Sequence, residues 1–205
     1  MGRPFCTIWV LVTLWVLVTL ALAGCATTSY TAGAVAAREG RYAEAVSHYQ
    51  EALAGDPDRL DALVGLGIAR FKLGALDEAI EVLERAVARA PGEATARLYL
   101  GLSHLRKGDL DRAEEHLTAF AGLQPERRLA AQAQRTLKLI RTKPLPEETR
   151  AFAAASLEDE AELVQEASEA WRALEYERYN RWYYPYYPGS FYGPGCYWRS
   201  SRLRC

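Results

Sequence analysis

The sequence predicts an all-α fold, an α-solenoid built from helix hairpins, and three observations lead to it. Prolines recur at an exact interval of 34 residues, at Pro57, Pro91 and Pro125. Within each interval, apolar residues follow one another at spacings of three and four, which places them on one face of a helix. Each interval also holds a glycine that divides it into two helical stretches, at Gly40, Gly74 and Gly108. Hairpins that repeat in this way stack into an array.

Residues 1–24 have the pattern of an export signal. Arg3 precedes an apolar stretch, residues 5–22, and the small residues Ala23 and Gly24 follow it. The stretch is close to the roughly 18 residues that could begin to span a membrane, so an uncleaved anchor is the alternative.

The end of this segment, Leu22-Ala23-Gly24-Cys25, resembles the bacterial lipobox. The resemblance implies that Cys25 becomes the mature N-terminus and carries acyl chains, with residues 25–30 forming the lipidated cysteine and a short tether. Two or more acyl chains anchor a protein stably without spanning the membrane. Because Ala26 rather than Asp follows the cysteine, the expected location is the cell envelope, at the outer membrane and facing the periplasm.

Residues 31–127 contain three copies of the 34-residue unit, and these resemble the tetratricopeptide repeat. The second copy carries that family's Leu-Gly, Ala, Leu and Pro at the family's spacing, at Leu66, Gly67, Ala79, Leu83 and Pro91. The third copy matches equally well, and the first is looser. A glycine inside a helix costs about 0.5–1 kcal/mol relative to alanine. We therefore expect the second helix of each hairpin to approach the first closely at this glycine.

The resemblance also implies a concave surface lined by the first helices, with an apolar groove. The repeat positions that face it hold Tyr30, Val64, Ile68, Phe71, Leu98, Leu102 and Leu105. Basic residues recur beside them at the 34-residue interval, at Arg38, Lys72 and Arg106. They predict either a basic edge that orients an acidic peptide or cations that complement the dipoles of their own helices.

One known ligand mode of the family is excluded by the first repeat. The clamp that holds chaperone tails needs Lys and Asn where this chain has Tyr30 and Ala34. An amphipathic helix seated in an apolar groove is therefore the expected ligand.

Two further helices are expected after the repeats. Residues 128–142 predict a capping helix, because Arg135 replaces the glycine that a packing partner would need. Residues 145–178 are strongly acidic and predict an amphipathic helix, with a capping-box signal at Ser156 and Asp159. Its apolar stripe packs either on the array or against a partner helix, and consists of Leu157, Ala161, Val164, Ala167, Trp171 and Leu174.

Residues 179–205 predict a low-complexity tail rich in Tyr, Trp, Pro, Gly and Arg. Aromatic faces together with arginines can hold a glycan strand or a partner protein. The alternative function is therefore that of a peptidoglycan-associated lipoprotein in which the repeats act as a spacer. Cys196 and Cys205 lie in this tail, and in an oxidising compartment they form either a disulfide or two free or intermolecular thiols.

No set of residues in the sequence predicts catalysis. The 25 Lys and Arg against 26 Asp and Glu give a net charge of −1, which argues against nucleic-acid binding. The three histidines, His48, His104 and His116, are not clustered, and no nucleophile, acid and base combine into a site. We expect no enzyme activity, metal or cofactor. The predicted function is a membrane-anchored scaffold that binds a protein or peptide partner and assists the assembly of an envelope complex.

Overall fold

The computed structural model describes residues 29–142, 144–183, 197–199 and 202–204. The chain divides into two compact units, Met1–Glu158 and Asp159–Cys205. The division falls inside one long helix, and each unit is described by itself.

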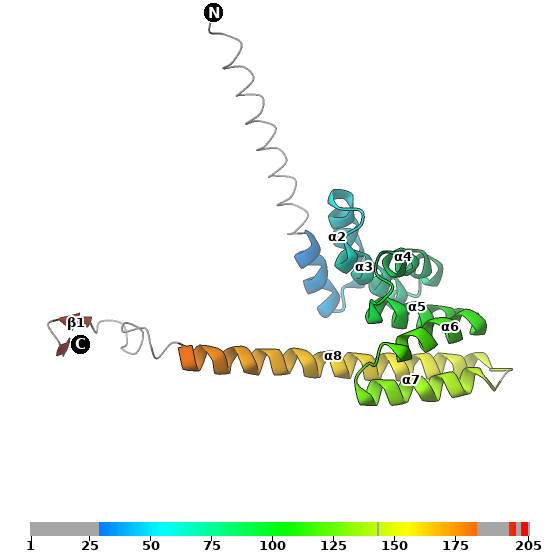
Figure 1. Cartoon of the computed structure of the whole chain (residues 1–205). Helices are drawn as coiled ribbons and strands as arrows, with labels where there is room; N and C mark the ends of the chain where they lie inside the picture. Colours follow the sequence, from blue (N-terminus) through cyan, green and yellow to red (C-terminus); the bar gives the residue numbers. More distant parts are fainter. Residues whose placement is uncertain (1–28, 143, 184–196, 200–201, 205) are drawn as a thin grey trace, which may run out of the picture. The chain divides into compact units, whose positions relative to one another are not determined.

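The first unit is a row of helix hairpins (Figure 1). The first hairpin joins helical residues 29–38 to α2 (Tyr42–Gly55), the second joins α3 (Leu60–Lys72) to α4 (Leu76–Arg89), and the third joins α5 (Ala94–Lys107) to α6 (Leu110–Gly122). Each helix packs on the next along the chain from α2 to α7, and α3 also contacts α5. The first helices of successive hairpins thus form one layer, and the predicted all-α solenoid is confirmed.

A left-handed glycine closes each hairpin turn. Gly40, Gly74 and Gly108 have φ angles of 74°, 78° and 93°, which residues with a side chain rarely adopt. At the second turn, the N–H of Ala75 donates to the carbonyl of Arg70 at 3.0 Å, and the N–H of Gly74 donates to that of Phe71. This pair of hydrogen bonds is the Schellman motif, which satisfies the last carbonyls of a helix.

Small alanines and large apolar side chains alternate in the core between the two layers. Ala45, Ala79 and Ala113 occupy the same position in the three repeats and are fully buried. Leu83 and Leu117 are equally buried four residues later. Equivalent core positions therefore recur every 34 residues along the chain.

Two helices follow the repeats. Helix α7 (Arg127–Ile140) packs on α6, and the side chain of Glu126 caps it by accepting from the N–H groups of Arg128 and Leu129. Helix α8 (Glu147–Tyr183) begins directly after Pro146, whose carbonyl accepts from the N–H of Arg150 at 3.0 Å. Ser156 lies inside this helix, so its interpretation as part of a capping box was wrong.

The second unit contains the rest of α8 and a short hairpin. Strands β1 (Tyr197–Arg199) and β2 (Arg202–Arg204) pair antiparallel, with Trp198 opposite Leu203. Helix α8 continues through Tyr183, into the segment expected as tail. Cys25, Cys196 and Cys205 lie outside the described residues. Of the helices that the structure describes, none combines the length and apolar character needed to cross a membrane.

Candidate functional site

The predicted groove residues fall into two groups by burial. Tyr30, Val64 and Ile68 are half-buried and leave part of each side chain at the surface. The remaining four are 0–3% exposed: Phe71, Leu98, Leu102 and Leu105. We call the first group the open groove. Leu98, Leu102 and Leu105 on α5 form what we call the covered groove, which is core in this structure and presents no free surface.

Phe71 is closed off by its neighbours in the next repeat. The ring of Tyr99 meets it edge-on at a centroid distance of 5.4 Å, and the guanidinium of Arg106 lies 4.8 Å above its centroid. Nη1 of Arg106 also donates to the carbonyl of Phe71 at 3.4 Å, in the last turn of α3. Arg106 therefore contacts the end of the preceding repeat's helix, whereas the sequence predicted either a free basic edge or an effect on the dipole of its own helix.

The other two members of the predicted basic edge have different surroundings. Nζ of Lys72 lies 2.5 Å from Oε1 of Glu158, and the two side chains are 18% and 13% exposed. Arg38 is exposed. The three basic residues therefore do not form one continuous free edge.

At one end of the open groove, the charged side chain of Arg59 stacks on the aromatic ring of Tyr30. The guanidinium of Arg59 lies 4.4 Å above the ring of Tyr30, and its Nε and Nη2 bind the carboxylate of Asp61 at 2.7 and 3.1 Å. Burial, assisted by the charge of Asp61, raises the pKa of the Tyr30 hydroxyl. Sequence reasoning missed Arg59 and Asp61, although Asp61 precedes Val64 by one helical turn and so could have been assigned to the same face.

Tyr49 packs against Tyr30 at this end of the groove. Its ring centroid lies 5.9 Å from that of Tyr30, and burial raises the pKa of its hydroxyl to about 12. A Cβ on Gly65 would lie 2.5 Å from Cζ of Tyr49, so only glycine leaves room for the ring at this point of α3.

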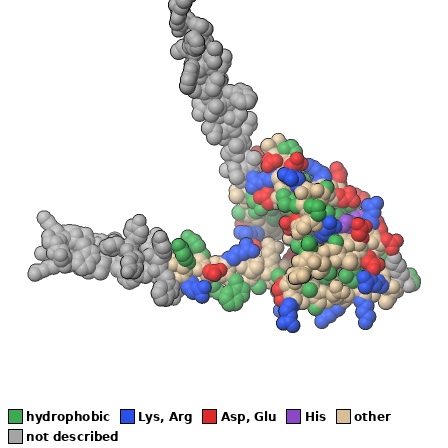
Figure 2. Space-filling model, viewed as in Figure 1, with side chains coloured by type: hydrophobic (Ala, Val, Ile, Leu, Met, Phe, Trp, Pro, Cys, Tyr) green, Lys and Arg blue, Asp and Glu red, His purple; other side chains and the backbone are tan. Residues whose placement is uncertain are grey.

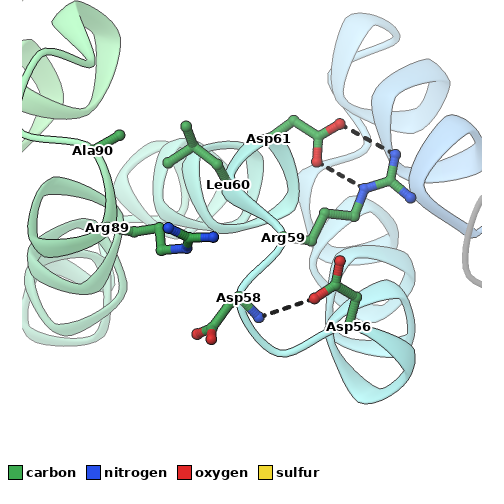
Figure 3. A pocket seen from close by; sticks show the side chains of 7 residues that line it. All are labelled: Asp56, Asp58, Arg59, Leu60, Asp61, Arg89 and Ala90. Carbon is green, nitrogen blue, oxygen red and sulfur yellow. Dashed lines mark hydrogen bonds and ion pairs between the residues drawn. The ribbon is translucent and has the colours of Figure 1, made fainter.

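A recess of about 500 Å³ adjoins the Arg59–Asp61 pair at the turn between the first two repeats (Figure 3). Its polar lining comes from Asp56, Asp58, Asp61, Arg59 and Arg89. The dashed lines of Figure 3 show Asp61 bound to Arg59, and the N–H of Asp58 bound to Asp56. Negatively charged carboxylates and positively charged guanidinium groups thus surround the recess. Its lining includes no Ser, Thr, Cys or Lys side chain that a neighbouring base could activate as a nucleophile.

The beginning of α8 lies on the groove side of the array. Besides the ion pair between Glu158 and Lys72, the guanidinium of Arg150 lies against Gly108, where an added Cβ would come within 2.9 Å of its Nη1. Between these two contacts, Ala153, Ala154 and Leu157 are at most 2% exposed. The apolar stripe of the predicted amphipathic helix therefore begins with a side chain packed in the first unit, at Leu157.

Two of the three histidines lie together, which the sequence did not predict. The rings of His104 and His116 stack with centroids 5.5 Å apart and planes inclined by 13°. Burial lowers the pKa of both imidazoles. Nδ1 of His104 lies 3.5 Å from the carboxylate of Asp109, and Nε2 has no hydrogen-bond partner among the described residues.

The described residues include no group of three or more His, Cys, Asp or Glu side chains that could hold a metal ion. Acidic and basic side chains are interspersed over the face of the repeats seen in Figure 2. Such a mixed surface favours no single highly charged ligand.

Comparisons with known proteins agree with the repeat structure. Two family models described as tetratricopeptide repeat match residues 36–94 and 77–128. The predicted tetratricopeptide repeats are therefore confirmed. Among curated proteins, none matches the sequence significantly.

Solved structures with the same fold include chaperones and peptide-binding domains. The type III secretion translocator chaperone SycD of Yersinia enterocolitica is 22% identical, with a TM-score of 0.54, over 57% of this chain and 83% of that one. Its complex with a peptide of the translocator YopD is also 22% identical, with a TM-score of 0.54, over 58% of this chain and 94% of that one.

The first tetratricopeptide domain of Spaghetti, bound to an HSP90 peptide, is 21% identical, with a TM-score of 0.53, over 57% of this chain and 90% of that one. At these identities, the likeness of all three solved structures concerns the fold alone.

Proposed function

We propose that this array of tetratricopeptide repeats is a lipid-anchored scaffold of the bacterial cell envelope, whose groove binds a helical segment of a protein partner and so assists the assembly of an envelope complex. The observation that carries the binding role is the open groove. Tyr30, Val64 and Ile68 leave apolar surface exposed on adjacent first helices, and the Arg59–Asp61 pair borders it. An apolar strip with charged residues at its border suits an amphipathic helix.

Solved structures with the same fold support a binding role. SycD and the Spaghetti domain have both been solved with peptides bound. The positions that would clamp a chaperone tail here hold Tyr30 and Ala34, and the ring of Tyr30 lies beneath Arg59. A carboxylate-clamp ligand is therefore disfavoured, and an apolar helical ligand remains.

The envelope location rests on the sequence. Residues 1–24 have the pattern of an export signal, and the lipobox resemblance ends at Cys25. Helical residues of the array begin by residue 29, so a lipid anchor at Cys25 would hold the groove near the membrane surface.

Site-specific photocrosslinking in cells tests the binding role. A photoreactive phenylalanine analogue in place of Ile68, in the open groove, should give a discrete adduct with a partner protein that mass spectrometry can identify. The matched control places the same analogue at Leu123, an apolar residue that is 40% exposed at the end of α6 and away from the groove. Equal adducts at both positions, or none at Ile68 in a folded protein, would contradict the proposal.

A second variant checks the apolar contact itself. Ile68→Glu should abolish the adduct formed from a photoreactive analogue at Val64, while helical circular dichroism and melting remain close to wild type. Leu102 is unsuitable for this purpose because it is fully buried, so a charge there would unfold the third repeat.

A further inference from the structure

The beginning of α8, residues 147–158, crosses two first helices on the groove side of the array. Arg150 contacts Gly108 at the end of α5, and eight residues later Glu158 binds Lys72 at the end of α3. Eight residues of helix rise about 12 Å, which is close to the 8–10 Å that separates packed helices. The segment therefore runs across the ends of α5 and α3, as a ligand seated along the groove would.

Equivalent groove positions differ in burial between the second and third repeats. Val64 and Ile68 on α3 are half-buried, whereas Leu98 and Leu102 hold the same positions on α5 and are at most 3% exposed. The beginning of α8 reaches both first helices, through Arg150 at Gly108 and Glu158 at Lys72. Between these two contacts, Ala153, Ala154 and Leu157 are buried in the same unit.

This contact has features of a seated ligand rather than of a permanent core. Residues 141–146 connect α7 to α8 and include Pro144 and Pro146, so α8 is a separate helix and does not continue α7. The Nε atom of Arg150 is buried without a hydrogen-bond partner among the described residues, which weakens the contact. An ion pair between Glu158 and Lys72 joins the segment to the repeats.

We propose that residues 147–158 are an internal ligand of the covered groove, and that the partner is a helix of the same pattern that replaces them. That pattern has two short side chains, as at Ala153 and Ala154, an apolar side chain one turn later, as at Leu157, and a carboxylate that pairs with Lys72. The inference rests on the proposed function, because it extends the helix-binding site from the open groove to the covered groove and names the kind of helix that binds there. An internal ligand acts at a high effective concentration, so the free protein takes an external helix only weakly.

A peptide-binding experiment on the full chain from Ala26 tests this. The probe is a fluorescein-labelled synthetic peptide with the sequence of residues 147–160, followed by fluorescence anisotropy. Glu158→Lys removes the ion pair of the internal ligand and leaves the groove intact. We expect this variant to bind the probe about tenfold more tightly than the wild type does. The reason is that the competing internal segment has lost one charged contact with the groove.

Charge exchange identifies Lys72 as the recognition residue. The double variant Lys72→Glu, Glu158→Lys restores an internal pair of opposite sign and should bind the wild-type probe no better than the wild-type protein does. Lys72→Glu alone should bind a probe that carries the Glu158→Lys change better than it binds the wild-type probe. The control is Lys107→Glu, which breaks an exposed ion pair with Asp77 of the same length, 2.5 Å, and should behave as wild type.

Amide hydrogen exchange provides a readout independent of the probe. In Glu158→Lys, exchange in residues 147–158 should accelerate while exchange in α3 and α4 remains unchanged. If this release occurs and the probe still does not bind, the groove is not a helix-binding site and the inference is overturned. A concentration-dependent dimer of the wild type, in which residues 147–158 occupy the groove of a second copy, would also overturn it.

The outcomes separate this inference from the proposed function. Binding of the probe to Glu158→Lys without any crosslink at Ile68 in cells supports the internal ligand and contradicts the partner-binding role. Crosslinks at Ile68 without probe binding by any variant support the partner-binding role and contradict the internal ligand.

Discussion

Two glycines inside the first helices determine how closely each hairpin packs. A Cβ on Gly67 would lie 2.5 Å from Cγ of Leu83, and one on Gly101 would lie 2.8 Å from Cγ of Leu117. These distances are shorter than real Cβ contacts. The expectation that the second helix approaches the first at these glycines is therefore confirmed.

Gly101→Ala should destabilise the fold by about 1–3 kcal/mol, because the added methyl group overpacks a full core. It also meets the backbone N of Leu117 at 3.3 Å, which cannot move as a side-chain end can. Gly122→Ala is the control, because Gly122 ends α6 with open space around it. That change should be neutral or stabilising by up to about 1 kcal/mol. Urea denaturation of both variants measures the difference, and equal stabilities would contradict the packing argument.

The stacked histidines predict a dependence of stability on pH. Burial lowers the pKa of His104 and His116 in the folded protein, while the unfolded value stays near 6.5. Below that pH the unfolded chain binds protons that the folded chain does not, so stability falls as the pH falls. The charges that act on the pair come from Asp109 in the turn, from Glu84 on α4, and from the histidines' own helices, with Arg97 on α5 and Arg112 and Glu115 on α6.

The double variant His104→Gln, His116→Gln should lose less stability than the wild type between pH 7.5 and pH 5.5. Urea midpoints at a series of pH values provide the measurement. Parallel slopes for the double variant and the wild type would mean that carboxylates alone carry the dependence.

At the scale of the elements, the sequence predicted the helix hairpins, because their signals come from residues close together in the chain. The hairpins follow from a 34-residue period in which glycine and the apolar positions are all local signals. The helix predicted over residues 145–178 begins at Glu147, directly after Pro146, but the capping signal at Ser156 was misleading because it lies inside this helix. The covered groove could not be predicted, since it depends on Glu158 meeting Lys72 from 86 residues away in the chain.

The hairpin turns offer a matched pair of variants for the contact of α8. Gly74→Ala and Gly108→Ala both force a side chain into a left-handed conformation, at a cost of about 1–2 kcal/mol each. Only at Gly108 does the new Cβ also meet a neighbour, the guanidinium of Arg150, whereas Gly74 has nothing within 4 Å. Limited trypsin digestion should therefore cleave after Arg150 faster in Gly108→Ala than in Gly74→Ala. Equal rates would show that the contact does not hold α8.

At the scale of the whole molecule, an anchor at Cys25, as proposed, would limit where the groove can act. About five residues separate Cys25 from Tyr30, and at about 3.5 Å per residue they span at most about 18 Å. A lipid anchor at Cys25 therefore places the open groove close to the membrane that carries it. The partner that we expect is in or at that membrane.

Insertion of a flexible linker of about 20 residues after Thr28 should impair complementation of a deletion strain, although probe binding in solution persists. The reason is that a longer tether lowers the effective concentration of the groove near a membrane partner without changing any contact. Incorporation of labelled palmitate, present in the wild type and absent in Cys25→Ala, checks the anchor itself. Full rescue by the linker variant would instead favour the alternative role at the peptidoglycan, which a longer reach helps.

The ion pair between Lys72 and Glu158 has a consequence for how such chains diverge. Both side chains are mostly buried, so reversal of one charge places two like charges side by side. In orthologues of this chain, the two positions should therefore change together, with opposite signs retained or both charges lost at once. The exposed pair of Lys107 and Asp77, at 52% and 80% exposure, is under no such restraint, and its two positions should drift independently.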